Sequence, residues 1–245
     1  MSGVAGTPRP PELDLLSFGD DIRTRLARVV EVLSAYRRAN VTGARGSRPA
    51  AGRLVGDALA LLDVEEVAAR SAAGARWLDL GSGNGIPGVP LLLALPAIEM
   101  TLLDSVTRKC AFVEQLVAEL GVIGRARVVC ERSERFAAPA APGREAFDVV
   151  LAKAVGSLAT VVELAAPLLK VGGALLAHKS AAQAEREWAG GEAAGRAYGL
   201  APRRIVPLPR SPLANSVCVV CEKAAPCPDD IPRREGLARS RPLRG

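Results

Sequence analysis

Two carboxylates and a run of glycines are the residues of this chain whose types and spacing suit ligand chemistry. Asp79 lies near the end of an apolar run, and Gly81, Gly83 and Gly85 follow it before a second apolar run begins at Val89. Glycine allows a positive φ and a close approach of the backbone to a ligand. The free N–H groups at a helix start attract polar or negative atoms. The stretch therefore predicts a strand, a tight loop and a helix that together hold a ligand.

A second acid, Asp104, indicates where that ligand lies. It ends the apolar segment 99–103 and follows Gly81 by 23 residues. The ends of two such strands are neighbours in a Rossmann-like sheet, where an acid accepts hydrogen bonds from ribose hydroxyls. NAD sites share this spacing, so the spacing does not separate NAD from S-adenosylmethionine. The loop continues into Ile-Pro-Gly-Val-Pro at 86–90 rather than an uninterrupted helix, and Asp79 is placed to attract a cationic group. Both features favour S-adenosylmethionine.

The end of a third strand adds a candidate for adenine recognition. Ser133 and Glu134 follow the expected strand 127–130, and their backbone is placed to read the edge of an adenine. A solvated loop charge is the competing interpretation of Glu134.

The elements that must position these residues alternate from Arg76 onward. Strands are expected over residues 76–80, 99–103, 127–130, 147–151, 174–178, 203–207 and 216–221. Helices are expected over residues 86–95, 106–120, 157–169 and 181–198, with a short helix or loop over 133–146. Strands separated by helices predict an α/β fold with a mostly parallel, seven-stranded, Rossmann-like sheet. A last strand that follows a polar hairpin fits an antiparallel addition to that sheet.

The chain divides into four segments by composition. Residues 1–11 are rich in Gly and Pro and are predicted to be disordered. Residues 12–73 form an N-terminal helical extension, with helices expected over about 12–38 and 50–72 and a basic loop between them. Residues 74–223 carry the alternating strands and helices, and residues 224–245 form a basic C-terminal tail.

Composition limits the classes of binding partner and the cellular compartment expected for this protein. The net charge is +6, and residues 32–56 contain five arginines and no acid. This clustering favours a polyanion such as nucleic acid, while simple solubility or a GC-rich genome is the alternative. Because no apolar run approaches the ~20 residues of a membrane span, we expect no membrane association. Early acids argue against a secretory signal, and five unevenly spaced cysteines favour the reducing cytoplasm.

Cys218 and Cys221 have the spacing of half a metal site. They lie in an apolar strand pattern with no second pair nearby, so the sequence favours no metal.

These motifs resemble the RsmG family, also called GidB. The resemblance rests on residues 79–90, on Thr-Leu-Leu-Asp-Ser at 101–105 and on Leu-Ala-Lys-Ala-Val at 151–155. It covers roughly residues 30–245 and reaches Asn40-Val-Thr and the Pro-Arg-Arg-Glu-Gly segment at 232–236. The resemblance implies an S-adenosylmethionine-dependent methyltransferase domain over 74–223. It further implies methyl transfer to N7 of a guanine in small-subunit 16S-type ribosomal RNA, either free or in an assembling subunit.

The resemblance also implies roles for individual residues. The expected cofactor-binding residues are Asp79, Gly81, Gly83, Gly85, Ile86, Asp104, Ser133, Glu134 and Lys153. Lys153 is in addition expected to position the guanine, through its O6 or a phosphate. The expected RNA-binding residues are Asn40, Arg53, Lys179, Arg233 and Arg234, the last two in a mobile tail that grips phosphates.

Two motifs depart from the family pattern. Where the family has Arg-His-x-x-Asp-Ser, this chain has Arg-Leu-Val-Gly-Asp-Ala at 53–58, without the His and the Ser. Where the family has Ser-Arg-Ala, this chain has Ala-Lys-Ala at 152–154, which keeps the charge and loses the planar fork of arginine.

The expected chemistry needs no general base, because N7 of guanine already carries an in-plane lone pair. Alignment and exclusion of water are then the main work of the protein, which agrees with a chain that has one histidine, His178. Three alternatives stay open: a non-catalytic module that binds S-adenosylmethionine or RNA, a methyltransferase with another RNA target, and an NAD-dependent oxidoreductase. The sequence offers no separate substrate domain with catalytic residues, which counts against the oxidoreductase. The protein is expected to be a cytoplasmic monomer.

Overall fold

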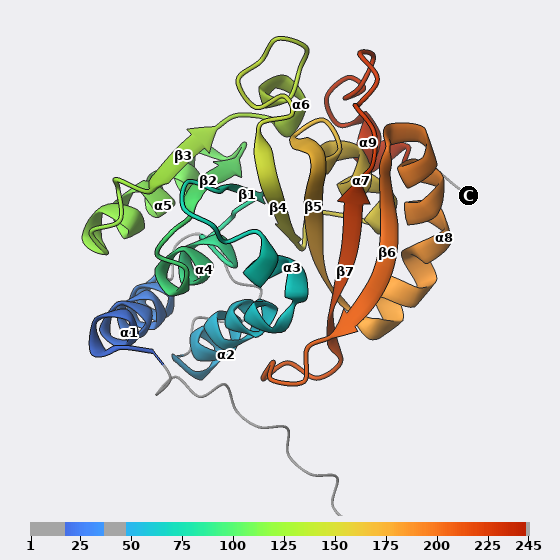
Figure 1. Ribbon diagram of the computed structural model, residues 1–245. Coiled ribbons are helices and arrows are strands. Elements are labelled where there is room, and N and C mark those ends of the chain that lie inside the picture. Colours follow the sequence, from blue (N-terminus) through green and yellow to red (C-terminus); the bar gives the residue numbers. More distant parts are fainter. Residues whose placement is uncertain (1–17, 37–47, 244–245) are drawn as a thin grey trace, which may run out of the picture.

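A single seven-stranded sheet organises the computed structural model, which describes residues 18–36 and 48–243 (Figure 1). The strands are β1 Arg76–Leu80, β2 Glu99–Asp104, β3 Ala126–Cys130, β4 Phe147–Lys153, β5 Leu169–Ser180, β6 Leu200–Pro207 and β7 Ser216–Lys223. Their order is β3-β2-β1-β4-β5-β7-β6. The first five are parallel, and β7 runs antiparallel to both β5 and β6. The mostly parallel sheet with an antiparallel last strand is therefore confirmed.

The helices confirm part of the expected pattern. They are α1 Asp20–Ala35, α2 Arg48–Leu59, η2 Ala60–Asp63, α3 Glu65–Ala69, α4 Gly88–Ala94, α5 Thr107–Glu119, α6 Ser133–Phe136, α7 Leu158–Ala165, α8 Ala181–Tyr198 and α9 Leu237–Ser240. The helix over 181–198 was predicted with these bounds, and a capping box at Ser180 and Gln183 explains its start.

Several expected elements differ in their bounds from the structure. Helix α7 ends at Ala165, before the expected residue 169, and β6 begins at Leu200, before the expected residue 203. The single helix over 50–72 is wrong, because Val64 takes an extended conformation that separates η2 from α3. Strand β5 begins at Leu169, five residues before the expected Ala174. Gly172 and Gly173 lie inside the strand, where the pairing with β4 shifts register and Gly172 has a φ of 83°. A bulge of this kind keeps a strand continuous through residues that resemble a turn.

Both faces of the sheet are buried, so neighbouring strand residues enter different cores. Trp77 belongs to the core shared with α1, α2, α4 and α5, whereas Leu78 belongs to the core shared with α6, α7 and α8. The N-terminal extension contributes the buried Leu26, Val29 and Leu33 to the first core. Since burial of each such side chain stabilises by about 1.5–3 kcal/mol, the extension is an integral layer of the fold.

The same alternation separates the two cysteines of β7. Cys218 packs in the Trp77 core and Cys221 in the Leu78 core, on opposite faces of the sheet. Burial raises the pKa of both thiols. The two side chains therefore do not converge on one metal ion. Across the described ranges, no group of three or more His, Cys, Asp and Glu side chains is arranged to hold a metal. No helix of residues 18–36 and 48–243 is long and apolar enough to cross a membrane.

The C-terminal segment folds back over α7. The Arg144 guanidinium donates to the carbonyls of Cys227 and Pro228, at 3.0 Å each, and to that of Ile231. Further along, Arg233 pairs with Glu163 of α7, whose side chain is 1% exposed, with an Nε–Oε1 distance of 2.7 Å. We call residues 231–241 the C-terminal strap. The strap is a packed part of the described fold, so the expectation of a mobile tail is wrong for these residues.

We predict that Arg233→Met lowers the free energy of unfolding by about 3–5 kcal/mol, because it leaves the Glu163 carboxylate buried and unpaired. The double variant Arg233→Met/Glu163→Leu should recover most of that loss, since it removes the charge as well as its partner. Urea unfolding of the wild type, both single variants and the double variant measures the coupling. Additive losses would show that the pair does not hold the strap.

Candidate functional site

The loop between β1 and α4 has no room for side chains at two of its glycines. Gly81 and Gly85 have φ values of 69° and 84°, in the left-handed region. A Cβ on Gly81 would lie 3.1 Å from Cγ2 of Val155, and one on Gly85 would lie 2.8 Å from Cγ2 of Val89. The backbone is therefore exposed at Gly81 toward the carboxyl ends of the strands, where a ligand can approach it closely.

Asp79 fastens the far end of this loop. Its side chain is 1% exposed, and its Oδ2 accepts a hydrogen bond from the backbone N–H of Gly88 at 2.8 Å. Oδ1 has no hydrogen-bond partner in the described structure. Burial, assisted by the nearby charge of Asp104, raises the pKa of Asp79 to about 7 against the opposing Gly88 bond. The carboxyl group therefore titrates near neutral pH.

Asp104 fastens the near end of the loop. Its Oδ2 accepts from the N–H of Gly83 at 3.0 Å, and its Oδ1 accepts from the N–H of Val106 at 2.9 Å. Lys109 of α5 lies 3.4 Å from Oδ2. The register places Leu103 of β2 beside Leu80 of β1, so the two strand ends are neighbours as predicted.

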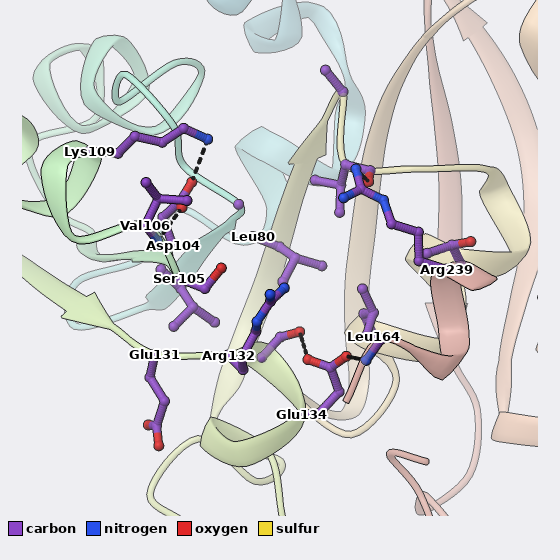
Figure 2. Close-up of a pocket in the computed structure, with 17 residues that line it drawn as sticks. Leu80, Asp104, Ser105, Val106, Lys109, Glu131, Arg132, Glu134, Leu164 and Arg239 are labelled. Atoms are coloured by element: carbon purple, nitrogen blue, oxygen red, sulfur yellow. Dashed lines mark hydrogen bonds and ion pairs between the residues drawn. The ribbon is translucent and has the colours of Figure 1, made fainter. Parts of the chain in front are cut away.

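A cavity of about 320 Å³ opens above these strand ends (Figure 2). Its lining includes four of the predicted residues, Gly81, Asp104, Ser133 and Glu134. Glu134 uses its carboxylate to hold the strap, because its Oε1 accepts from the N–H of Gly236 at 2.8 Å.

Five predicted residues do not line the cavity. They are Asp79, Gly83, Gly85, Ile86 and Lys153. The lining includes a wall that the sequence analysis did not assign to the site: Val155, Thr160, Leu164, Gly236 and Arg239. The Pro-Arg-Arg-Glu-Gly segment marked the strap in the sequence, but nothing in its spacing indicates contact with α6, 102 residues earlier.

The lining fits S-adenosylmethionine. Asp104 presents a carboxylate to the cavity for ribose hydroxyls, and Gly81 leaves the backbone bare where a Cβ would be crowded. Ser133 and Glu134 supply backbone beside the same cavity, and its volume is in the range that holds a small ligand.

A second polar cluster surrounds Asp57 of α2, which is 1% exposed. Lys153, at the end of β4, pairs with its Oδ2, and His178 Nε2 lies 3.1 Å from its Oδ1. The hydroxyls of Ser211 and Ser216 donate to the same Oδ1. Burial alone would raise the pKa of Asp57, but the His178 hydrogen bond and the charges of His178 and Lys153 outweigh it and hold the pKa below its usual range. Asp57 therefore stays ionised and keeps Lys153 in place.

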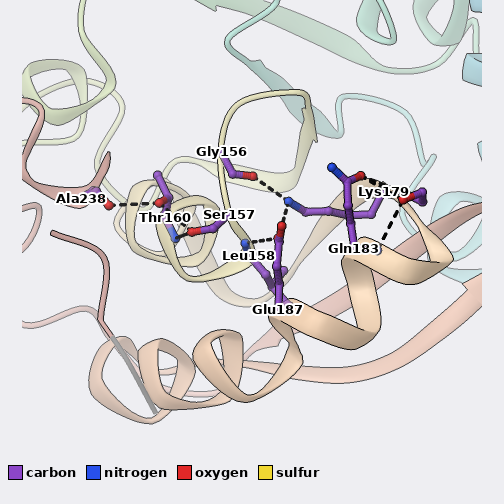
Figure 3. Close-up of polar contacts among 9 residues, drawn as sticks. Gly156, Ser157, Leu158, Thr160, Lys179, Gln183, Glu187 and Ala238 are labelled. Atoms are coloured by element: carbon purple, nitrogen blue, oxygen red, sulfur yellow. Dashed lines mark hydrogen bonds and ion pairs between the residues drawn. The ribbon is translucent and has the colours of Figure 1, made fainter. Parts of the chain in front are cut away.

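The expected RNA-binding residues differ in whether their side chains already have protein partners. Lys179 donates to the Gly156 carbonyl at 2.6 Å and to Glu187 Oε2 at 2.8 Å, which joins β5 to the loop before α7 and to α8 (Figure 3). Arg233 is held by Glu163. Arg53 on α2 and Arg234 in the strap are exposed. Asn40 lies outside the described residues.

The strand order, the glycine loop after β1 and the acid at the end of β2 define an S-adenosylmethionine-dependent methyltransferase fold. The mitomycin 7-O-methyltransferase MmcR has this fold with a TM-score of 0.54 at 17% identity, over 83% of this chain and 68% of that one.

The chain belongs to the GidB family, described as rRNA small subunit methyltransferase G, whose model matches residues 26–208. A ribosomal RNA small subunit methyltransferase G from Rubrobacter xylanophilus is 36% identical over 218 residues, which cover 87% of this chain and 81% of that protein. A protein of the same name from Limosilactobacillus reuteri is 37% identical over 166 residues, 67% of this chain and 68% of that protein. The family resemblance of the sequence is thereby confirmed.

We predict that Gly81→Arg abolishes cofactor binding, because the side chain must enter the cavity from a position with no room beside Val155. Gly124→Arg is the matched control, since an added Cβ at Gly124 meets nothing within 4 Å. Calorimetric titration with S-adenosylhomocysteine compares the two variants with the wild type. Undiminished binding by Gly81→Arg would show that the site is placed wrongly.

We predict that Asp79→Asn flattens the dependence of stability on pH. The folded pKa of about 7 exceeds the unfolded value of 3.8, so the folded state binds the proton more tightly. The resulting stability is present below pH 4 and is lost as the pH rises through 7, by roughly 2–4 kcal/mol. Urea unfolding from pH 4 to 8 should show this fall in the wild type and a smaller one in Asp79→Asn. Parallel curves would contradict the raised pKa.

Proposed function

We propose that this protein transfers a methyl group from S-adenosylmethionine to N7 of a guanine in small-subunit ribosomal RNA. The observation that carries the proposal is the cavity between Gly81 and Asp104 in a chain of the GidB family. The relatives from Rubrobacter xylanophilus and Limosilactobacillus reuteri carry names that specify this class of RNA.

The cavity supports transfer by alignment. S-adenosylmethionine would supply an electrophilic methyl group on its sulfonium. The in-plane N7 lone pair would form the new N–C bond as the S–C bond breaks, which would leave 7-methylguanine and S-adenosylhomocysteine. Two acids on the walls are fixed by backbone N–H groups, which suits positioning: Asp104 accepts two such bonds, and Glu134 accepts one from Gly236. A reaction without proton abstraction gains its rate from orientation and from exclusion of water.

We assign the cofactor contacts by position. Asp104 holds the ribose hydroxyls, the backbone of Ser133 and Glu134 meets the adenine edge, and Gly81 faces the methionyl part. Asp79, Gly83, Gly85 and Ile86 act indirectly. They shape the loop, and Asp79 places a titrating carboxyl behind it.

Lys153 is the residue we assign to the guanine. It directly precedes Ala154 and Val155, which line the cavity, and Asp57 holds its ammonium group. An ammonium at this strand end donates to guanine O6 or to a neighbouring phosphate. Asp57 is thereby a positioning residue for Lys153.

The RNA-facing surface is assigned to residues that are exposed or basic. Arg53 and Arg234 are exposed and can meet phosphates. Asn40, outside the described residues, is assigned to RNA from the family resemblance of its Asn-Val-Thr segment. Lys179 and Arg233 already bind Glu187 and Glu163, so they contribute mainly by shaping that surface. We place the reaction in the cytoplasm, which the unevenly spaced cysteines favour, and expect a monomer to act on free RNA or on an assembling subunit.

The test is methyl transfer from radiolabelled S-adenosylmethionine to purified 16S ribosomal RNA and, separately, to small subunits. We expect label in 7-methylguanosine at one mapped base with the wild type and none with Gly81→Arg. The better of the two substrates identifies the natural form of the RNA.

Two results would overturn the proposal in different ways. Cofactor binding without transfer to either RNA would indicate a binding module. Label at another atom or base type would show that the protein is a methyltransferase with a different target.

A further inference from the structure

Arg239 is a cationic side chain on the cavity wall that no described carboxylate neutralises. It lies on α9, lines the cavity and donates from Nη2 to the carbonyl of Val155 at 3.2 Å. The other basic side chains of the lining are Lys109, which pairs with Asp104, and Arg132, which adjoins Ser133 at the adenine end. Arg239 therefore offers a guanidinium to a ligand at the remaining end of the cavity.

The position of Arg239 identifies that end. Val155, whose carbonyl it binds, packs with its side chain against Gly81. Figure 2 shows Arg239 and Asp104 on opposite sides of the pocket. If the ribose of an adenosine binds Asp104 and its adenine lies beside Ser133, its 5′ substituent points toward Gly81 and Arg239.

The guanidinium is carried on a fixed segment. Thr160 donates to the carbonyl of Ala238 at 3.0 Å, directly before Arg239, and Glu134 binds Gly236 at 2.8 Å. The buried pair of Arg233 and Glu163 anchors the same strap. The backbone that carries Arg239 is therefore already ordered, so ligand binding does not need to order it.

We propose that Arg239 binds the carboxylate of the methionyl end of the cofactor. The 5′ substituent of S-adenosylmethionine is an amino acid, and its carboxylate suits the planar fork of a guanidinium. This inference rests on the cofactor site proposed above. It makes the C-terminal strap a part of that site and assigns the strap a charge-selective contact.

The test compares two nucleosides that share the adenosine and sulfur. S-adenosylhomocysteine carries the carboxylate, and 5′-methylthioadenosine lacks the amino acid. For Arg239→Gln we expect the Kd for S-adenosylhomocysteine to rise about 10- to 100-fold, as for the loss of a hydrogen bond to a charged group, with an unchanged Kd for 5′-methylthioadenosine. Arg196→Gln, an exposed arginine of α8, is the control for the lost charge and should change neither.

Unchanged binding of 5′-methylthioadenosine also shows that the variant is folded. Equal weakening of both nucleosides would overturn the inference, because Arg239 would then act by shaping the wall. Undiminished binding of S-adenosylhomocysteine together with weaker RNA binding would also overturn it, because the guanidinium would serve a phosphate. If Arg239→Gln selectively weakens binding of S-adenosylhomocysteine but the wild type methylates no RNA, the role of Arg239 is supported and the proposed RNA acceptor is wrong.

Discussion

The site depends on one constraint: carboxylates at the ends of two strands must fix the conformation of the glycine-rich loop between β1 and α4. Glycines let a ligand approach the loop closely, but they leave it without side chains to pack. Asp79 and Asp104, at the ends of neighbouring strands, accept from Gly88 and Gly83 respectively and fasten the loop at both ends. The parallel register of β1 and β2 brings the two acids to the same edge. The sheet therefore determines the shape of the loop through two hydrogen bonds.

The carboxylates of Asp79 and Asp104 differ in the hydrogen-bond donors and charges that surround them. Asp104 has two backbone donors and Lys109, so its negative charge is well supported at the cavity. Asp79 has one donor and an unpartnered oxygen, so burial favours its protonated form near neutral pH. A cation that approached the loop would favour the ionised form. The placement of Asp79 behind the loop thus couples its protonation to whatever charge the cavity receives.

The sequence predicted the strand, glycine loop and helix after Arg76, and the helix over 181–198, because the information there is local. The glycines directly follow β1, and the capping box at Ser180 and Gln183 begins α8. The sequence did not predict the segments whose structure depends on contacts between residues far apart in the chain. The strap is fixed by Arg233 and Glu163, 70 residues apart, and basic composition alone does not distinguish a gripping tail from a packed one. The break at Val64 likewise follows from packing that periodicity does not report.

The two motifs that depart from the family pattern meet in one cluster through a retained acid and a substituted cation. The acid of the first motif is kept as Asp57, and the cation of the second is Lys153, which binds it. An ammonium is a point charge that reaches one carboxylate oxygen, whereas a guanidinium can bind both. Here Oδ2 receives Lys153, and Oδ1 is supplied by His178 and two serine hydroxyls. The buried carboxylate is therefore fully bonded without a second arginine hydrogen bond, so a lysine at this position is compatible with an ordered site.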